Sequence, residues 1–192
     1  EGLLPDKVTF VSSLDACITD ASLTKGKQIH CYILSNHFGL DTFIGSALIN
    51  MYGKCGSLHD AENAFNYMPR QTIVSWNAFI ATFAQHGKVK QTICNFDRMK
   101  QEVAPDKVTF IILLTACSHA GLIAEALYCL SLLERYYGFL TSIDHLNCII
   151  DMLGRMGRLC EMQILIANMP FQPTGVPYTT LLNSCKQNFQ MD

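Results

Sequence analysis

Apolar residues recur along this chain at helical spacing, and the whole pattern repeats with a period of about 35 residues. Five stretches in one register open at Lys7, Thr42, Ile73, Lys107 and Ile143. The eighth residue of every stretch is leucine or isoleucine, and the fifteenth is glycine in all but the first, which has alanine there. Such self-similarity is typical of a repeat array, in which each unit buries its apolar face against its neighbours.

Each repeat contains two apolar series separated by a short turn. In the third repeat, the first series predicts a helix that ends near Gly87, where glycine can adopt the left-handed backbone of a helix C-cap. The second series predicts another helix, which Pro105 ends. The two series are Ile73, Trp76, Ile80 and Ala84, then Val89, Ile93, Phe96 and Met99. We therefore predict an all-α chain of helical hairpins, because the alternative of an ordinary bundle does not need glycine at one fixed offset.

Composition narrows the possible functions. With 192 residues, of which 49% are hydrophobic and 16% charged, the chain can bury a continuous core. No apolar run reaches the roughly 18 residues of a membrane span, so we expect no membrane partner. The formal charge of -2 counts against a strong, nonspecific nucleic-acid binder, which is normally basic. It does not exclude a narrow stripe that reads a sequence.

We expect no metal, cofactor or catalytic site. The nine cysteines include no Cys-x-x-Cys pair, and the six histidines show no ligand spacing, so free thiols buried in the core are predicted. The deaminase signature, His-x-Glu with Pro-Cys-x-x-Cys, is absent. The Lys25-Gly26-Lys27 segment lacks the upstream glycine of a phosphate loop. The chain is therefore not predicted to be an enzyme or to take a small-molecule substrate.

Longer motifs connect the repeats to a known family. Residues 46–58 read Ser-Ala-Leu-Ile-Asn-Met-Tyr-Gly-Lys-Cys-Gly-Ser-Leu, and residues 115–122 read Thr-Ala-Cys-Ser-His-Ala-Gly-Leu. Residues 152–159 read Met-Leu-Gly-Arg-Met-Gly-Arg-Leu. On these motifs the chain resembles the pentatricopeptide repeat family, in its plant form with alternating P, L and S units. Tetratricopeptide repeats have a similar period, but their characteristic Trp, Gly, Tyr and Pro positions are not met here.

The resemblance implies an α-solenoid of helix-turn-helix hairpins, wound as a right-handed superhelix with the first helices lining its concave face. It divides the chain into the end of a preceding repeat at 1–6, an L-type repeat at 7–41, an S-type repeat at 42–72, a P-type repeat at 73–106, an L-type repeat at 107–142, an S-type repeat at 143–174, and the start of an E-type extension at 175–192. Because the chain opens in mid-repeat, we expect a fragment. The glycine usual in the family between Glu102 and Val103 is missing, which predicts a shorter turn there.

In this family each repeat addresses one base of single-stranded RNA. By resemblance, the fifth residue of a first helix meets the base edge, and the last residue of the repeat assists. The pairs that can hydrogen-bond a base are Asn77 with Asp106, Ser46 with Thr72, and Asn147 with Thr174. The first is the family's uridine-favouring pair. The second indicates a purine without deciding between adenine and guanine, and the third indicates a pyrimidine. The L-type repeats have Val11 with Asp41 and Ile111 with Ser142, so they are expected to tolerate any base.

Two further positions complete the implied interface. The second residue of each first helix packs against a base face, and these residues are Val8, Phe43, Val74 and Val108. Asp144 departs from this pattern, because a carboxylate against a base is unfavourable. The thirteenth position can approach phosphates and carries the cations Lys54 and Arg155. Asn77 is expected at an exposed helix position, whereas Trp76 is expected in the core.

The resemblance predicts sequence-specific binding of single-stranded organelle RNA, as the specificity part of an RNA processing or C-to-U editing factor in the mitochondrion or chloroplast. Editing or ribosomal proteins are the protein partners it implies. The alternative is a helical-repeat scaffold for proteins inside an organelle ribosome or another large complex. The acidic pI, the two L-type repeats and Asp144 favour that alternative.

Overall fold

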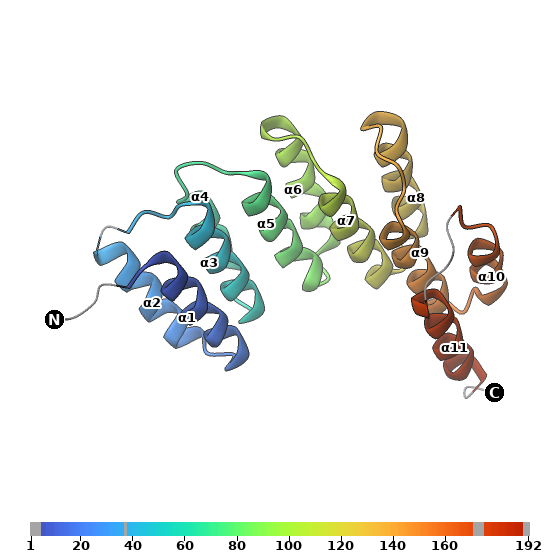
Figure 1. Ribbon diagram of the computed structural model, residues 1–192, viewed down its shortest axis with the longest axis horizontal. Coiled ribbons are helices and arrows are strands. Elements are labelled where there is room, and N and C mark those ends of the chain that lie inside the picture. The colour runs from blue at the N-terminus through green and yellow to red at the C-terminus, as the bar shows by residue number, and fades with distance from the viewer. Residues whose placement is uncertain (1–4, 37, 171–174, 190–192) are drawn as a thin grey trace. The chain divides into compact units, whose positions relative to one another are not determined.

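A computed structural model describes residues 5–36, 38–170 and 175–189, with side chains up to residue 186. These residues form helices joined by turns, paired as successive hairpins (Figure 1). The hairpins are α1 (Lys7–Thr19) with α2 (Leu23–Ser35), α3 (Thr42–Lys54) with α4 (Leu58–Asn66), α5 (Ile73–Gln85) with α6 (Val89–Glu102), α7 (Lys107–Ala120) with α8 (Ile123–Ser131), and α9 (Ile143–Arg155) with α10 (Leu159–Ala167). The described part ends in α11 (Gly175–Phe189). The predicted all-α hairpin architecture is confirmed.

The chain divides into two compact units between Pro105 and Asp106. In the first unit, α3 packs against both α1 and α5, so the first helices of successive hairpins lie side by side. In the second unit, α9 packs in the same way against α7 and α11. The division falls in the turn 103–106, which is shorter than the turns 36–41 and 67–72. This is the turn that lacks the family's glycine.

The first helices begin at the five residues that open the sequence repeats, because the residue before each one is an N-cap. The caps are Asp6, Asp41, Thr72, Asp106 and Ser142. All but Ser142 accept a hydrogen bond from a backbone N–H group of the first turn, which would otherwise have no partner inside the helix. The start of every first helix is therefore specified locally.

The apolar series of the sequence become the core. The eighth residue of each first helix is fully buried, or almost so: Leu14, Ile49, Ile80, Leu114 and Ile150. Trp76 is also fully buried beside Phe65 and Phe79, which confirms that it is a core residue. Neighbouring hairpins thus share one continuous core within each unit.

Close contacts between first helices repeat at one offset. A Cβ added to Gly53 of α3 would lie 2.6 Å from Thr82 Oγ1 of α5. A Cβ added to Gly154 of α9 would lie 2.2 Å from Ser184 Oγ of α11. Gly53 and Gly154 are each the twelfth residue of their helix, and Thr82 and Ser184 are each the tenth. Helix α11 therefore packs on α9 in the register in which α5 packs on α3.

The fourth repeat is one residue longer than the first. A π-helical turn takes up the extra residue. The turn spans Leu132–Tyr136 and continues α8. In the first repeat the N–H of Phe38 donates to the carbonyl of Ile33, five residues back. In the fourth, the N–H of Phe139 donates to the carbonyl of Leu133, six residues back. Ile33 and Leu133 are both fully buried, so the wider turn keeps the core register despite the insertion.

The prediction of buried thiols is wrong for a third of the cysteines. All nine are free, but Cys31, Cys94 and Cys160 are exposed. Each lies on a second helix, at a position that faces away from the core. Among the residues that the structure describes, no three His, Cys, Asp or Glu side chains are grouped to hold a metal ion. None of the described helices has the length and hydropathy to cross a membrane.

Candidate nucleic-acid interface

The second residue of four successive first helices is a large apolar side chain exposed to solvent. The exposed fractions are 71% for Val8, 74% for Phe43, 56% for Val74 and 51% for Val108. At the same place α9 has Asp144, which is also exposed, and α11 has Val176, exposed by 53%. Exposed apolar residues are normal when scattered. Recurrence at one offset sets these residues apart in each unit, and we call the set the second-residue row.

Val8 and Phe43 line a common cavity between α1 and α3. Its volume is about 330 Å³, and Lys7, Val11 and Ser12 complete its lining. Val11 is the fifth residue of α1. We call this cavity the first slot. It brings together two predicted packing residues, Val8 and Phe43, and the fifth residue of the first repeat, Val11.

The fifth residues lie deeper than the second-residue row. Asn77 is only 9% exposed, so the expectation of an exposed position is wrong. Ser46 and Asn147 are half-buried. Ser46 Oγ and Asn147 Oδ1 are buried atoms without a hydrogen-bond partner in the described part of the chain. A buried polar atom without a partner is unusual and calls for an explanation.

Asn147 lies in a cavity of the second unit. The cavity has a volume of about 270 Å³ and lies among α7, α9 and α11. Its polar lining includes Asp151, which accepts a hydrogen bond from Ser118 Oγ at 2.9 Å, and Val176 is part of its apolar lining. Thr174, the predicted partner of Asn147, lies outside the described residues.

The last residue of each of the first four repeats is the N-cap of the next first helix, so this position already has a structural role. Thr72 forms a capping box with Ser75, and Asp106 forms one with Thr109. Asp106 Oδ1 accepts from Thr109 N at 2.9 Å and from Thr109 Oγ1 at 3.0 Å. Asn77 belongs to the first unit and Asp106 to the second.

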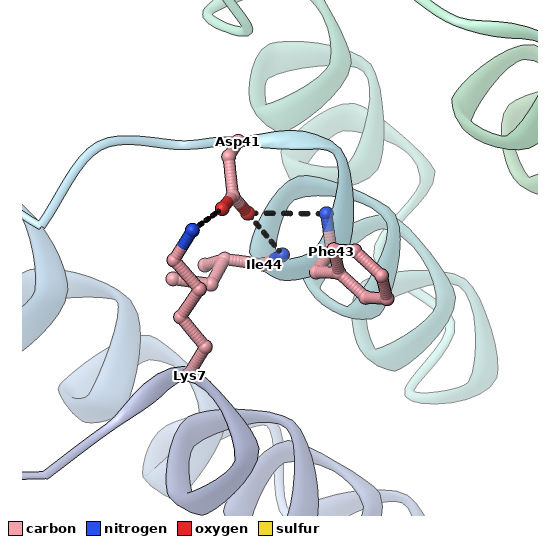
Figure 2. A network of polar contacts seen from close by, with 4 residues as sticks. All are labelled: Lys7, Asp41, Phe43 and Ile44. Carbon is pink, nitrogen blue, oxygen red and sulfur yellow. Dashed lines mark hydrogen bonds and ion pairs between the residues drawn. The ribbon is translucent and has the colours of Figure 1, made fainter.

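Asp41 is a cap with an ion pair as well as backbone hydrogen bonds (Figure 2). Oδ1 accepts from the backbone N–H groups of Phe43 and Ile44, both at 3.1 Å, and Oδ2 is ion-paired with Lys7 Nζ. Partial burial alone would raise the pKa of the Asp41 carboxyl, but the hydrogen bond and charge of Lys7, with the two N–H groups, hold it below its usual value. Sequence reasoning missed this ion pair, because the partners are 34 residues apart.

The two predicted phosphate ligands differ. Lys54 and Arg155 are both exposed at the ends of their helices. Arg155 Nε, however, is bonded to Asp151 Oδ2 at 2.9 Å on the preceding turn of α9. Its charge is therefore partly compensated within the chain.

A larger cavity, of about 690 Å³, lies away from the second-residue row and was not predicted. His30 of α2 and Tyr52 of α3 line it, together with residues of α4 and of the turns at 38–40 and 67–69. His30 Nδ1 is 2.8 Å from the Tyr52 hydroxyl. Burial lowers the pKa of His30 although Asp60 is near, and it raises the pKa of Tyr52.

Comparison with known proteins finds family models and solved structures that match these repeats. The family model "PPR repeat family" matches residues 71–119, and the model "PPR repeat" matches residues 46–73 and 108–136. Two crystal structures of the pentatricopeptide repeat protein PPR10 from maize match the fold. PPR10 alone gives a TM-score of 0.76 at 20% identity, over 95% of this chain and 27% of PPR10. PPR10 in complex with an 18-nt psaJ RNA element gives 0.78 at 18% identity, over 95% of this chain and 28% of PPR10. The predicted solenoid class is confirmed, and the hand of the superhelix stays a prediction.

Curated relatives come from Arabidopsis thaliana. One pentatricopeptide repeat-containing protein is 37% identical over the whole of this chain, which corresponds to 32% of the relative. Two more, both named mitochondrial, are 40% and 38% identical over 96% and 93% of this chain, and over 20% and 30% of their own lengths. The chain thus spans a third or less of the length of these relatives. On these matches and on the repeat fold, the chain belongs to the plant pentatricopeptide repeat proteins.

Proposed function

We propose that this chain binds single-stranded RNA along its first helices, with one base for each hairpin. The observation that carries the proposal is the second-residue row, in which apolar side chains more than half exposed recur at one offset. Base faces are apolar and flat, and stacking or packing against them tolerates any sequence. A row with one such side chain per repeat suits an extended strand with one base per repeat.

The fifth residues supply the edge contacts in this proposal. Asn77 and Asn147 offer an amide, which both donates and accepts, and Ser46 offers a hydroxyl. Ser46 Oγ and Asn147 Oδ1 have no partner in the described structure, and a base edge can supply one. The proposed reading pairs remain Asn77 with Asp106, Ser46 with Thr72, and Asn147 with Thr174. The proposed packing residues remain Val8, Phe43, Val74 and Val108.

The relatives support a finer proposal. PPR10 has been crystallised with an 18-nt RNA element, and two of the Arabidopsis relatives are named mitochondrial. We therefore place this chain in an organelle, mitochondrion or chloroplast, as the specificity part of an RNA processing or C-to-U editing factor. In this role it has no chemistry of its own, and editing proteins are its expected partners.

The protein-scaffold alternative has two specific observations in its favour. The cavity lined by His30 and Tyr52 is the largest of those described, and it lies off the second-residue row. The exposed carboxylate of Asp144 also opposes RNA on the fifth repeat. In this alternative the repeats hold polypeptide, for example in an organelle ribosome.

A negative charge introduced into the row distinguishes the two functions. In the complete protein, Val108→Asp places a carboxylate in the row at a residue already half exposed, so the fold is retained. RNA binding from a random-sequence single-stranded pool should fall at least about tenfold, because both packing and charge oppose the strand. Ile164→Asp is the matched control, since Ile164 is 62% exposed but lies on α10, a second helix.

Crosslinking of the complete protein in organelle extract gives the second readout. RNA crosslinked to first-helix peptides supports the proposal. If the wild-type protein binds no RNA from the pool at low salt and its first helices crosslink to polypeptide, protein scaffolding replaces RNA binding as the proposed function.

A further inference from the structure

The first slot has no acid in its own lining, but one of its lining residues, Lys7, is ion-paired with Asp41. Asp41 is the last residue of the first repeat, the position that assists base reading in the proposed function. Both of its carboxylate oxygens are engaged: Oδ1 by the N-terminal N–H groups of α3, and Oδ2 by Lys7 (Figure 2). Lys7 also lines the slot, so the residue that holds Asp41 is itself part of the slot wall.

The other side chains of the slot offer little for reading a base edge. Val11, in the fifth position, has no hydrogen-bonding group, and Val8 and Phe43 present only apolar surface. The ammonium of Lys7 donates but cannot accept. With Asp41 held by Lys7, the slot has packing surfaces, the hydroxyl of Ser12 and a cation, and the carboxylate of Asp41 is kept from accepting from the N–H groups of a base.

The pairing of a first-residue lysine with a last-residue acid occurs in one repeat of the five. The third repeat ends in Asp106 but opens with Ile73, which cannot form an ion pair. The fourth opens with Lys107 but ends in Ser142, which carries no charge. The first repeat alone combines Lys7 with Asp41, and the structure brings them together across 34 residues.

We propose that Lys7 is a specificity-determining residue that withdraws Asp41 from base reading, so that the first slot holds any RNA base by packing between Val8 and Phe43. This inference rests on the proposed RNA-binding function. It also predicts that the lack of base preference in the first slot depends on Lys7, and not on Val11 alone.

The test is selection by the complete protein from a random-sequence single-stranded RNA pool, with the enriched bases counted at each position. For the wild type, the position bound by the first slot should show a spread among the four bases of less than about twofold. In Lys7→Met, which keeps the length of the side chain but removes the charge, Asp41 can accept from a ring N–H group. Guanosine and uridine carry such a group, so one position should gain a preference for them of about threefold to tenfold.

Two variants isolate the cause. Lys7→Arg keeps the ion pair and should leave every position as in the wild type. Lys7→Met combined with Asp41→Ser keeps an N-cap side chain while it removes the carboxylate, so the gained preference should disappear. Loss of the lysine charge also weakens binding, but equally for all sequences, and the base counts separate that effect.

A readout without RNA checks the ion pair itself. The pKa of the Asp41 carboxyl, measured by NMR titration, should rise in Lys7→Met because the hydrogen bond and charge that lower it are lost. An unchanged pKa, or base preferences in Lys7→Met identical to those of the wild type, overturns the inference while leaving the proposed function in place. Absence of any enriched sequence for the wild type overturns the proposed function and the inference with it.

Discussion

Ala21 is the residue at which the chain departs from its own pattern. The fifteenth residue of the other four repeats is glycine, with φ between 65° and 80°, and Ala21 adopts φ 48° in the same place. Among the described residues it is the only one other than glycine with a positive φ. The left-handed region costs an L-residue about 1–2 kcal/mol. The hairpin turn therefore imposes this backbone even where the sequence does not favour it.

We predict that Ala21→Gly stabilises the first unit. Relief of the left-handed strain outweighs the greater freedom of glycine in the unfolded chain, so the net gain should be about 0.5–1 kcal/mol. The measurement is the free energy of unfolding from chemical denaturation. Gly56→Ala is the converse control: Gly56 has φ 80° and open space around its Cα, so any loss of stability there comes from the backbone alone. A midpoint that does not move in either variant would contradict the argument.

Single-residue environments were the least predictable part of the site. Helical periodicity placed Ile80 in the core, where it is fully buried. The family resemblance gave Val8, Phe43, Val74 and Val108 as base-packing residues, which are exposed, while their contact with a base stays a prediction. Neither predicted that Asn77 is buried. Burial of a fifth residue depends on the side chains of neighbouring helices, which are distant in sequence.

At the scale of the helix, the starts and ends follow from local chemistry. Caps and turn residues act within four positions of themselves, and the first helices therefore begin at the opening residues of the sequence repeats. The π-helical turn at Leu132–Tyr136 is different. The repeat lengths show one extra residue in the fourth repeat, but they do not show where it is taken up. That place is set by Leu133, which must stay in the core.

Helix-to-helix packing gives a prediction for Gly53 and Gly154. A Cβ at Gly53 would lie 2.6 Å from Oγ1 and 2.8 Å from Cγ2 of Thr82. Because Thr82 is β-branched, its side chain has little freedom to turn away from both contacts. At Gly154 the 2.2 Å contact is with a single Oγ. Ser184 is not β-branched and can rotate, at the cost of its hydrogen bonds, one of which is to the Thr180 carbonyl. Gly53→Ala should therefore cost about 1–3 kcal/mol, and Gly154→Ala less.

Denaturation of both variants, alone and with a second substitution, checks this order. Thr82→Ala should recover part of the stability lost in Gly53→Ala, and Ser184→Ala should do so for Gly154→Ala. If Gly154→Ala is as stable as the wild type and shows no coupling to Ser184→Ala, α11 does not pack on α9 in the repeat register.

At the scale of the whole molecule, charge decides how strongly RNA can be held. The formal charge of -2 gives no general attraction to phosphate, so local cations must supply it. The sequence places Lys54 and Arg155 at equivalent positions and suggests equal roles. The structure separates them, because Asp151 accepts a bond from Arg155 and another from Ser118 Oγ, while Lys54 has no ion pair among the described contacts. Contacts of this kind, one helical turn apart on a surface, depend on rotamers that periodicity does not specify.

Lys54→Ala and Arg155→Ala should therefore differ in their salt dependence. For a single strand, each phosphate contact contributes about 0.7 to the slope of log K against the logarithm of salt concentration. In the complete protein, Lys54→Ala should lower the slope by about that amount and weaken all RNA sequences alike, since a phosphate contact carries no base information. Arg155→Ala should lower it by clearly less, because binding a phosphate there requires competition with Asp151. Titrations of a selected RNA at four salt concentrations give both slopes. If both variants lower the slope by the same amount, the Asp151 pair opens freely when RNA binds. If neither variant changes the slope from that of the wild type, the thirteenth residues do not face the phosphates.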